Sequence, residues 1–459
     1  LRNSSAASDV YKRQILYYPI DSWFIKASSF RDKMVSLNKK INWKPKSTGE
    51  GRFEKWLENV NDWNLSRSRF WGIPLPIWRT EDGKEEVCIG SVNELITEIN
   101  KSVAKGFMKK NIFSEFEIND LSDQNYSKID LHKNVVDNII LVSPSGKKMT
   151  REEDLIDVWF DSGSMPYAQW HYPFDNKEYI DTNNFYPADF IAEGVDQTRG
   201  WFYTLHAIST MVFDSISYKN VISNGLVLDK NGQKMSKRLG NAVDPFKTLS
   251  DFGPDATRWY MISNSNPWDN LKFDLSGVDE VKRKFFGTLY NTYSFFALYA
   301  NIDNFRFTEN EIKLNDKPEL DRWIISELNT LIRNVENFYD DYEPTKAARE
   351  ITNFVNDNLS NWYVRLSRRR FWKGEYELDK ISAYQTLFTV LVDICKISAP
   401  ISPFFMDKMF QDLTKNIEGN FQQSVHLEAF PEYDTSKIDK SLEEKVNYAQ
   451  IISSLTLSL

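Results

Sequence analysis

The clearest candidates for chemistry are three cationic side chains, Lys234, Lys237 and Arg238, inside the string Lys-Met-Ser-Lys-Arg. Asn231-Gly232 precedes them and predicts a tight turn, because both residue types tolerate positive φ. A loop after such a turn can place two ammonium groups and a guanidinium on a polyphosphate, whose oxygens accept charge-assisted hydrogen bonds. The alternative for a pair of lysines is a solvated run of charge, and the whole string favours phosphate binding.

A second candidate site lies upstream, at Glu193, Gly194, Asp196 and Gln197. Glu193 follows a short apolar run, residues 190–192, which predicts a strand, and the later residues open a predicted helix. A carboxylate at the carboxyl end of a strand, followed by glycine, can meet ribose hydroxyls while the helix N-terminus faces an anion. A helix cap is the alternative, and Asp196 alone would provide it. The lysine-containing loop farther along the chain favours nucleotide binding.

The elements that must position these residues are short apolar runs separated by a helix. Residues 190–192 and 221–222 are short enough for buried strands, and Val195–Phe213 between them predicts a helix. This order is typical of a parallel α/β fold. Leu226–Asp229 predicts a further strand, which enters the hairpin turn before the cationic string. We therefore predict an α/β region over residues 151–279.

The last part of the chain, residues 280–459, predicts a helical bundle. Apolar residues recur at i, i+4, i+7 and i+11 on one face of a long helix: Val355, Leu359, Trp362 and Leu366. A second predicted helix, which must end before Pro400, carries four further apolar residues: Phe388, Leu391, Val392 and Cys395.

The beginning of the chain divides into three further segments. Residues 1–14 are small and polar and are interpreted as a non-native or disordered tail. Residues 15–78 are rich in Trp and Arg and end in an extended connection, because two closely spaced prolines exclude a helix or a central strand. Residues 79–150 predict a peripheral insertion, with a helix near Val92–Ala104 and then a polar loop.

Composition excludes several classes of protein. The 459 residues carry 57 Lys and Arg against 65 Asp and Glu, a net charge of −8, so a globally basic nucleic-acid coat is excluded. Cys88 and Cys395 are too few and too far apart for a disulfide scaffold or a cysteine-rich zinc site, and they suit a reducing cytosol. No apolar run is long enough for a membrane span. Walker A and GxGxxG patterns are both missing from the sequence.

Together, these and other strings resemble the class I aminoacyl-tRNA synthetases, in particular the isoleucyl branch. Besides Lys-Met-Ser-Lys-Arg, the matching strings lie at residues 66–72, 157–163, 193–202 and 361–372. The preference for the isoleucyl branch rests mostly on Asp-Val-Trp-Phe-Asp-Ser-Gly at 157–163, since valyl and leucyl enzymes share the architecture. The resemblance implies an α/β fold, the second half of a Rossmann-like catalytic domain, followed by an all-α anticodon-binding helical bundle.

The resemblance also implies which residues meet the nucleotide. It assigns catalysis to Lys234 and Lys237. It assigns binding of ATP or the adenylate to five residues: Glu193, Gly194, Asp196, Gln197 and Lys237. The implied reaction is attack of the L-isoleucine carboxylate on the α-phosphorus of ATP, then acyl transfer to the terminal ribose of tRNA(Ile). Mg²⁺ would accompany ATP, held by the phosphates without a metal site on the protein.

Two further sets of residues follow from the same resemblance. Trp159 and Trp201 would form walls of the isoleucine side-chain pocket, because flat apolar surfaces suit a branched aliphatic chain. Arg365, Arg368 and Arg369 share a helix face at i, i+3 and i+4 and would bind tRNA. We expect a cytoplasmic monomer.

The sequence also departs from the family pattern. The HIGH signature is absent, and none of the four histidines lies in such a string. His171 and His206 are interpreted as ordinary surface or packed residues. The missing half of the nucleotide fold and an editing domain would precede residue 15, so we expect this chain by itself to be inactive.

Three alternatives to an isoleucyl enzyme remain at this point: a valyl or other class I synthetase, a non-catalytic tRNA-binding paralogue, and a nucleotidylyltransferase of the same superfamily. The intact lysine loop favours an enzyme over a binding module. The arginine-rich helical region disfavours the nucleotidylyltransferase.

Overall fold

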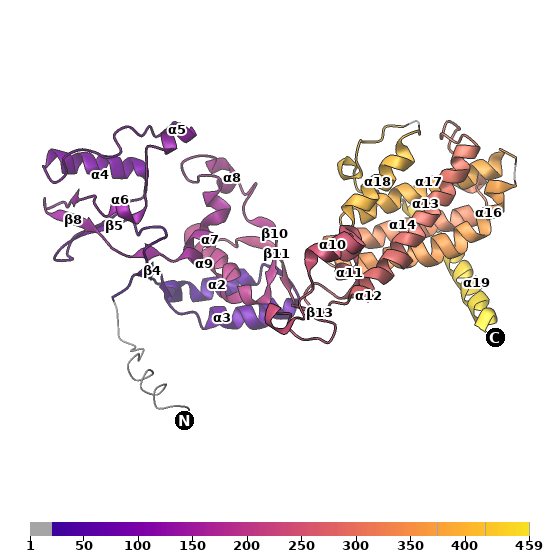
Figure 1. Cartoon of the computed structure of the whole chain (residues 1–459), viewed down its shortest axis with the longest axis horizontal. Helices are drawn as coiled ribbons and strands as arrows, with labels where there is room; N and C mark the ends of the chain where they lie inside the picture. Colours follow the sequence, from indigo (N-terminus) through magenta and orange to yellow (C-terminus); the bar gives the residue numbers. More distant parts are fainter. Residues whose placement is uncertain (1–20, 374, 418, 459) are drawn as a thin grey trace, which may run out of the picture. The chain divides into compact units, whose positions relative to one another are not determined.

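The computed structural model describes residues 21–373, 375–417 and 419–458. Its chain divides into two compact units, Leu1–Val221 and Ile222–Leu459, each with a hydrophobic core of its own (Figure 1). The predicted tail at 1–14 lies outside the described residues, as do residues 15–20.

A three-stranded sheet organises the first unit. Its strands, in spatial order, are β10 (Ala188–Gly194), β11 (Tyr218–Asn224) and β2 (Asn42–Lys44). The Ala188 amide donates to the Ser217 carbonyl at 2.9 Å, and Lys219 pairs with Asp189 at 2.8 Å. The adjacent strands β10 and β11 therefore begin side by side and run parallel, with a helical connection between them. This confirms the predicted strand–helix–strand unit.

Helices cover this sheet and share its core. They are α2 (Arg31–Asn38), η2 (Thr48–Phe53), α3 (Glu54–Glu58) and α9 (Trp201–Phe213), and α7 (Val158–Ala168) packs against α9. Trp43, Phe53, Phe202 and Tyr218 form the buried aromatic centre. The shorter elements nearby are β1 (Phe24–Ile25), η1 (Ala27–Phe30), β3 (Trp63–Asn64), β4 (Ser66–Arg67), β9 (Leu155–Ile156) and α8 (Lys177–Asp181).

The helix predicted over Val195–Phe213 is interrupted at Gly200, so the prediction of one continuous helix was wrong. Residues 195–199 form the 3₁₀ helix η3, and α9 starts at Trp201. Gln197 Oε1 accepts a hydrogen bond from the Trp201 amide at 2.9 Å, which satisfies the first N–H of α9. The apolar pattern could not show this break, because α9 is buried around its whole circumference from Phe202 to Thr210 and has no single apolar face whose phase could change.

Between these elements, residues 77–151 form a small antiparallel sheet with its own core. Its strands, in spatial order, are β6 (Glu86–Cys88), β5 (Ile77–Thr80), β8 (Lys148–Arg151) and β7 (Leu141–Val142). The predicted helix is confirmed as α4 (Val92–Ala104), followed by the short helices α5 (Asp123–Tyr126) and α6 (Lys133–Val136). The sequence analysis missed the strands, because runs of two to four residues show no clear alternation.

The proline-containing stretch before this sheet is extended, as predicted. The Leu75 amide donates to the Asp154 carbonyl at 3.3 Å, and the Ile156 amide donates to the Ile73 carbonyl at 2.7 Å. The stretch thus runs beside the chain that leads into α7.

The second unit opens with a parallel pair of short strands, β12 (Val227–Leu228) and β13 (Leu271–Lys272). The chain between them carries η4 (Lys237–Leu239), α10 (Pro245–Phe252) and α11 (Pro254–Asn264). After β13, three helical segments follow without a break: α12 (Leu275–Val281), η5 (Lys282–Phe286) and α13 (Gly287–Ile302).

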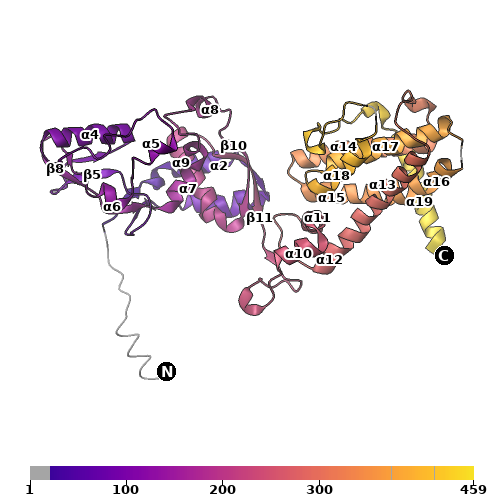
Figure 2. The ribbon, with the colours of Figure 1, turned by 45° about the horizontal axis from the view of Figure 1, so that its top comes forward.

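The remainder of the second unit is the predicted helical bundle (Figure 2). Its helices are η6 (Leu314–Asp316), α14 (Glu319–Asp340), α15 (Pro344–Asn353), η7 (Phe354–Val364), α16 (Arg365–Trp372), α17 (Leu378–Ser398), α18 (Pro403–Thr414), η8 (Val425–Leu427), η9 (Thr435–Lys437) and α19 (Lys440–Ser458). Most of α17 is buried, and it ends before Pro400 as predicted.

One residue of the predicted apolar face departs from the bundle core. Val355 and Leu359 are fully buried, but Leu366 is 53% exposed. The cause is η7, a π-helix, whose wider turn rotates the face that follows it. Ser367 and Phe371 are therefore the residues of α16 that are buried.

A buried ion pair and its hydrogen bonds join four helical elements of the bundle, α14, α16, η7 and α17. Asp321 of α14 is completely buried and receives both Nη atoms of Arg370 of α16, at 2.6 and 2.8 Å. Tyr363 and Ser382 donate to the same carboxylate at 2.9 and 2.6 Å. A buried carboxylate is tolerated when it is paired and hydrogen-bonded in this way.

The bundle also buries a carboxyl group that should make its stability depend on pH. Burial, with the neighbouring Glu443 carboxylate, raises the pKa of Glu327 to about 7. Because the folded state holds this proton more tightly than the unfolded chain does, acidification through the range between about 7 and 4.5 should stabilise the fold. We predict that the urea midpoint rises as the pH falls from ~8 to ~6.

The matched variants are Glu327→Gln and Glu444→Gln, the second at an exposed position on α19. Glu327→Gln should remove most of that rise and stabilise the chain above neutral pH, since the neutral amide carries no charge to desolvate. Glu444→Gln should leave the pH dependence unchanged. Equal pH dependence in Glu327→Gln and the unaltered chain would contradict the prediction.

Candidate active site

The two tryptophans of the predicted side-chain pocket lie together at the starts of α7 and α9. Trp201 Nε1 donates to the Ser162 carbonyl at 2.9 Å, which ties the first turn of α9 to α7. A Cβ built on Gly200 would lie 3.3 Å from Trp159 Cη2, so the Trp159 indole rests against the residue before Trp201. Trp159 remains 41% exposed, whereas Trp201 is partly buried against the core.

A buried carboxylate that the sequence analysis did not single out holds the start of α7. Asp157 caps this helix, with its Oδ1 accepting from the Trp159 amide at 3.3 Å. Its Oδ2 accepts from Arg67 at 2.7 Å and from Trp63 Nε1 at 3.0 Å. Arg67 comes from the matched string at 66–72, so two of the strings in the resemblance meet at one carboxylate. The preference for Asp at the N-cap of helices is the sequence signal that could have identified this role of Asp157.

Four of the predicted nucleotide-binding residues lie on one turn at the carboxyl end of β10: Glu193, Gly194, Asp196 and Gln197. Glu193 is exposed, and Gly194 ends the strand. Gln197 Nε2 donates to Asp196 Oδ2 at 2.9 Å, and its Oε1 holds the start of α9. Arg52 of η2 donates to Thr198 Oγ1 at 2.8 Å, which fixes the turn from the other side. The structure therefore brings Gln197 and the two tryptophans together, with Glu193 at the adjoining strand end.

In the second unit, the predicted hairpin before the cationic string is confirmed. Leu228 and Lys234 form an antiparallel bridge, and Gly232 has a φ of 82°. Asp229 Oδ1 accepts from the Asn231 and Gln233 amides at 2.9 and 2.8 Å. These bonds lower the pKa of Asp229 below its usual value, with the Gln233 amide the largest cause.

Asn241 closes the loop that follows this hairpin. Its Oδ1 accepts from the Ser236 amide at 2.9 Å, and its Nδ2 donates to Asp229 Oδ2 at 2.9 Å. Lys234 and Arg238 are exposed, while the side chain of Lys237 lies outside the described residues. Their loop is therefore shaped by two polar side chains, Asp229 and Asn241, whose role the sequence analysis did not predict.

The three predicted RNA-binding arginines form an exposed set on α16. Arg365, Arg368 and Arg369 are all exposed, and within the described residues none of them forms an ion pair. Their neighbour Arg370 instead forms the buried ion pair with Asp321. Arg368 and Arg369 form no ion pair with a nearby glutamate in the described part of the bundle.

The two histidines interpreted as packed or surface residues occupy such positions. His206 is fully buried, and Met34 O lies 2.9 Å from its Nε2. Burial lowers the pKa of His206 to about 4. His171 is exposed and lies 2.7 Å from Asp175.

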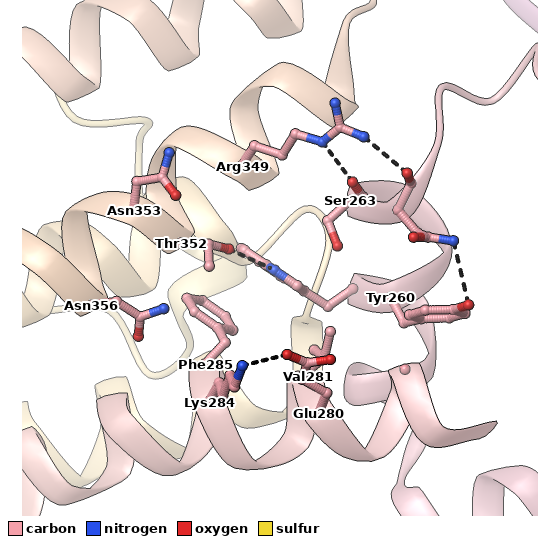
Figure 3. Close-up of a pocket in the computed structure, with 13 residues that line it drawn as sticks. Tyr260, Ser263, Glu280, Val281, Lys284, Phe285, Arg349, Thr352, Asn353 and Asn356 are labelled. Atoms are coloured by element: carbon pink, nitrogen blue, oxygen red, sulfur yellow. Dashed lines mark hydrogen bonds and ion pairs between the residues drawn. The ribbon is translucent and has the colours of Figure 1, made fainter. Parts of the chain in front are cut away.

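A cavity of about 400 Å³ lies in the second unit, and no described side chain of the predicted site lines it (Figure 3). α11, α12, η5, α15 and η7 line it. Arg349 closes one side, donating to the carbonyls of Ser263 and Asn264 at 2.7 and 2.9 Å. Lys284 and Glu280 form an ion pair across from it at 2.5 Å. Its charged side chains are thus engaged with the protein itself.

Within the described residues, no helix combines the length and the hydrophobicity that a membrane span requires. No group of three or more His, Cys, Asp or Glu side chains in the same ranges could hold a metal ion.

Comparison with known proteins places both units in one family. Residues 4–274 match the family of class I tRNA synthetases (I, L, M and V), and residues 321–458 match the anticodon-binding domain of tRNA ligases. The isoleucine–tRNA ligase of Bacteroides fragilis is 63% identical over 97% of this chain and 39% of its own length. That of Porphyromonas gingivalis is 62% identical over 97% and 39%, and that of Clostridium novyi is 49% identical over 96% and 40%. The chain thus spans about two fifths of these relatives.

Solved structures show the same fold at much lower identity. Methionyl-tRNA synthetase of Mycobacterium tuberculosis, in complex with methionyl-adenylate, has a TM-score of 0.58 at 16% identity, over 85% of this chain and 62% of its own. A LeuRS of Agrobacterium radiobacter, in a ternary complex with tRNA and LeuAMS, has a TM-score of 0.57 at 18% identity, over 83% and 44%. The chain therefore belongs to the class I tRNA synthetases, and its similarity to the isoleucine–tRNA ligases extends over 97% of its length.

Proposed function

We propose that the protein carrying this chain ligates L-isoleucine to tRNA(Ile), with ATP, through an isoleucyl-adenylate. The observation that carries the proposal is the 63% identity to isoleucine–tRNA ligase over 97% of the chain. The geometry of the first unit supports it, because two tryptophans and Gln197 adjoin the turn after β10. Ligands of parallel α/β folds bind at the carboxyl ends of the strands.

On the amino-acid side, Trp159 and Trp201 would contact the isoleucine side chain. Gln197 and Asp196 present an amide and a carboxylate beside them, suited to the polar atoms of the amino acid and the adenylate. Glu193 and Gly194 would meet the ribose, since a carboxylate accepts hydrogen bonds from hydroxyls. Little covalent chemistry is asked of these residues, which hold the carboxylate of isoleucine in line with the α-phosphorus.

On the phosphate side, Lys234 and Lys237 would stabilise the charge that develops as pyrophosphate leaves. The Asp229–Asn241 framework supports this proposal, because it fixes the loop before substrate arrives and so reduces the cost of ordering it. Mg²⁺ would enter with ATP and neutralise part of the phosphate charge.

In the helical bundle, Arg365, Arg368 and Arg369 would bind the anticodon stem-loop through its phosphates. Three exposed guanidinium groups without ion pairs in the described part of the chain can each meet a phosphate. The match of residues 321–458 to an anticodon-binding domain supports this placement. We also propose that the protein acts in the cytoplasm as a monomer.

The phosphate role of Lys237 predicts a loss in rate rather than in binding. In the full-length protein, Lys237→Ala should lower isoleucine-dependent pyrophosphate exchange on the order of a hundredfold, about 3 kcal/mol in transition-state stabilisation. Isoleucine affinity should change little, because the lysine meets the phosphates.

Lys230→Ala is the matched control for this variant, since it removes the same charge from an exposed position in the same hairpin. It should leave the exchange rate near that of the unaltered protein. An unchanged rate in Lys237→Ala would transfer the phosphate role to Lys234 or Arg238.

The RNA role of the arginines predicts a change in salt dependence. The double variant Arg368→Ala/Arg369→Ala should bind tRNA(Ile) more weakly, with a plot of log K against log salt concentration shallower by about one unit per lost phosphate contact. Filter binding over a salt series measures this slope.

Lys408→Ala/Lys415→Ala provides the matched loss of charge, at exposed positions at and beside α18. Its slope should stay that of the unaltered protein. If both double variants reduce the slope equally, the effect is one of net charge and the arginines hold no phosphate.

A further inference from the structure

Gly200 lies between two groups of the proposed amino-acid site, and a side chain there would collide with both. A Cβ at this buried position would be 3.3 Å from Trp159 Cη2 and 2.6 Å from Gln197 Oε1. Both distances are shorter than carbon atoms normally approach such neighbours. We propose that Gly200 is a specificity-determining position, whose missing side chain sets the place of the Trp159 wall and so the selection of isoleucine over valine. This inference rests on the proposed function.

The surroundings of Gly200 show which neighbour would move. Gln197 is held at both ends, by the Trp201 amide and by Asp196, each at 2.9 Å. Trp201 is itself tied to Ser162 through its indole N–H. The Trp159 indole has no hydrogen bond from its ring within the described residues and is 41% exposed, so it can shift with least resistance. The absence of a side chain at Gly200 therefore allows the Trp159 indole to occupy its observed position.

A shift of Trp159 in either direction would weaken the contacts of isoleucine with the pocket more than those of valine. If the indole moves into the side-chain pocket, it meets the longer isoleucine chain first. If the indole moves outward, isoleucine loses contacts that valine, one methylene shorter, never made. The discrimination that one methylene supplies is small even in a well-fitted pocket, ~1–3 kcal/mol in this enzyme family, so it depends on that wall.

The test is pyrophosphate exchange by the full-length protein with isoleucine or valine as the amino acid. Gly200→Ala should lower kcat/KM for isoleucine, and the ratio of kcat/KM for isoleucine to that for valine should fall on the order of tenfold. Because Gln197 also holds the amide of Trp201, a Trp159→Phe background is what isolates the Trp159 wall. KM for ATP should be unchanged.

Two further variants separate positioning from damage to the fold. Gly49→Ala introduces a clash in the core of the same unit, against the Trp43 indole, and should lower stability but keep the isoleucine-to-valine ratio. In a Trp159→Phe background, Gly200→Ala should change the ratio far less than it does alone, because the residue that it displaces is already smaller.

Three results would count against the inference. An unchanged ratio in Gly200→Ala, an equal fall in Gly49→Ala, or simple additivity with Trp159→Phe would each overturn it. A full-length protein without isoleucine-dependent exchange would instead overturn the proposed function.

Discussion

The proposed amino-acid site depends on the close packing of α7 against α9. Gly163 makes this possible, because a Cβ there would lie 2.8 Å from Ile208 Cδ1 and 3.1 Å from the backbone carbon of Thr204. With Trp159 against Gly200 and Ser162 against Trp201, the two helices start side by side and run in the same direction. Their N-termini, which carry partial positive charge, therefore lie together beside the end of β10, where they would attract the carboxylate of the proposed substrate.

Around this helix pair, the segments most involved in the proposed chemistry are held by polar side chains more than by apolar packing. Asp157 fixes the start of α7, and Gln197 fixes the start of α9. In the second unit, Asp229 and Asn241 shape the cationic loop in the same manner. Such bonds order a loop while leaving Lys234 and Arg238 exposed, as the proposed binding of phosphates requires. The loop is thereby organised before any ligand is present, which reduces the entropy cost of binding.

In the helical bundle, polar interactions likewise determine which arginine is buried and which arginines are exposed. Arg370 is buried and paired with Asp321, because an unpaired guanidinium could not be desolvated there. The neighbouring Arg368 and Arg369 face solvent and retain their charge for a partner. Neighbouring arginines of one helix thus have different surroundings. The rotation of the buried face that η7 causes determines which of them points inward.

The sequence by itself determined the family, the parallel strand–helix–strand unit, the hairpin before the cationic string and the helical bundle. These features depend on local signals: strings of fixed residues, apolar periodicity, and the turn preference of Asn-Gly. The tertiary structure alone decided where the helices break, at Gly200, and how the π-helix rotates the buried face away from Leu366. It also decided that Asp157 joins Arg67 and Trp63, residues some ninety positions away. Contacts of that kind have no period along the chain, because they are fixed by packing between elements and not by the residues on either side.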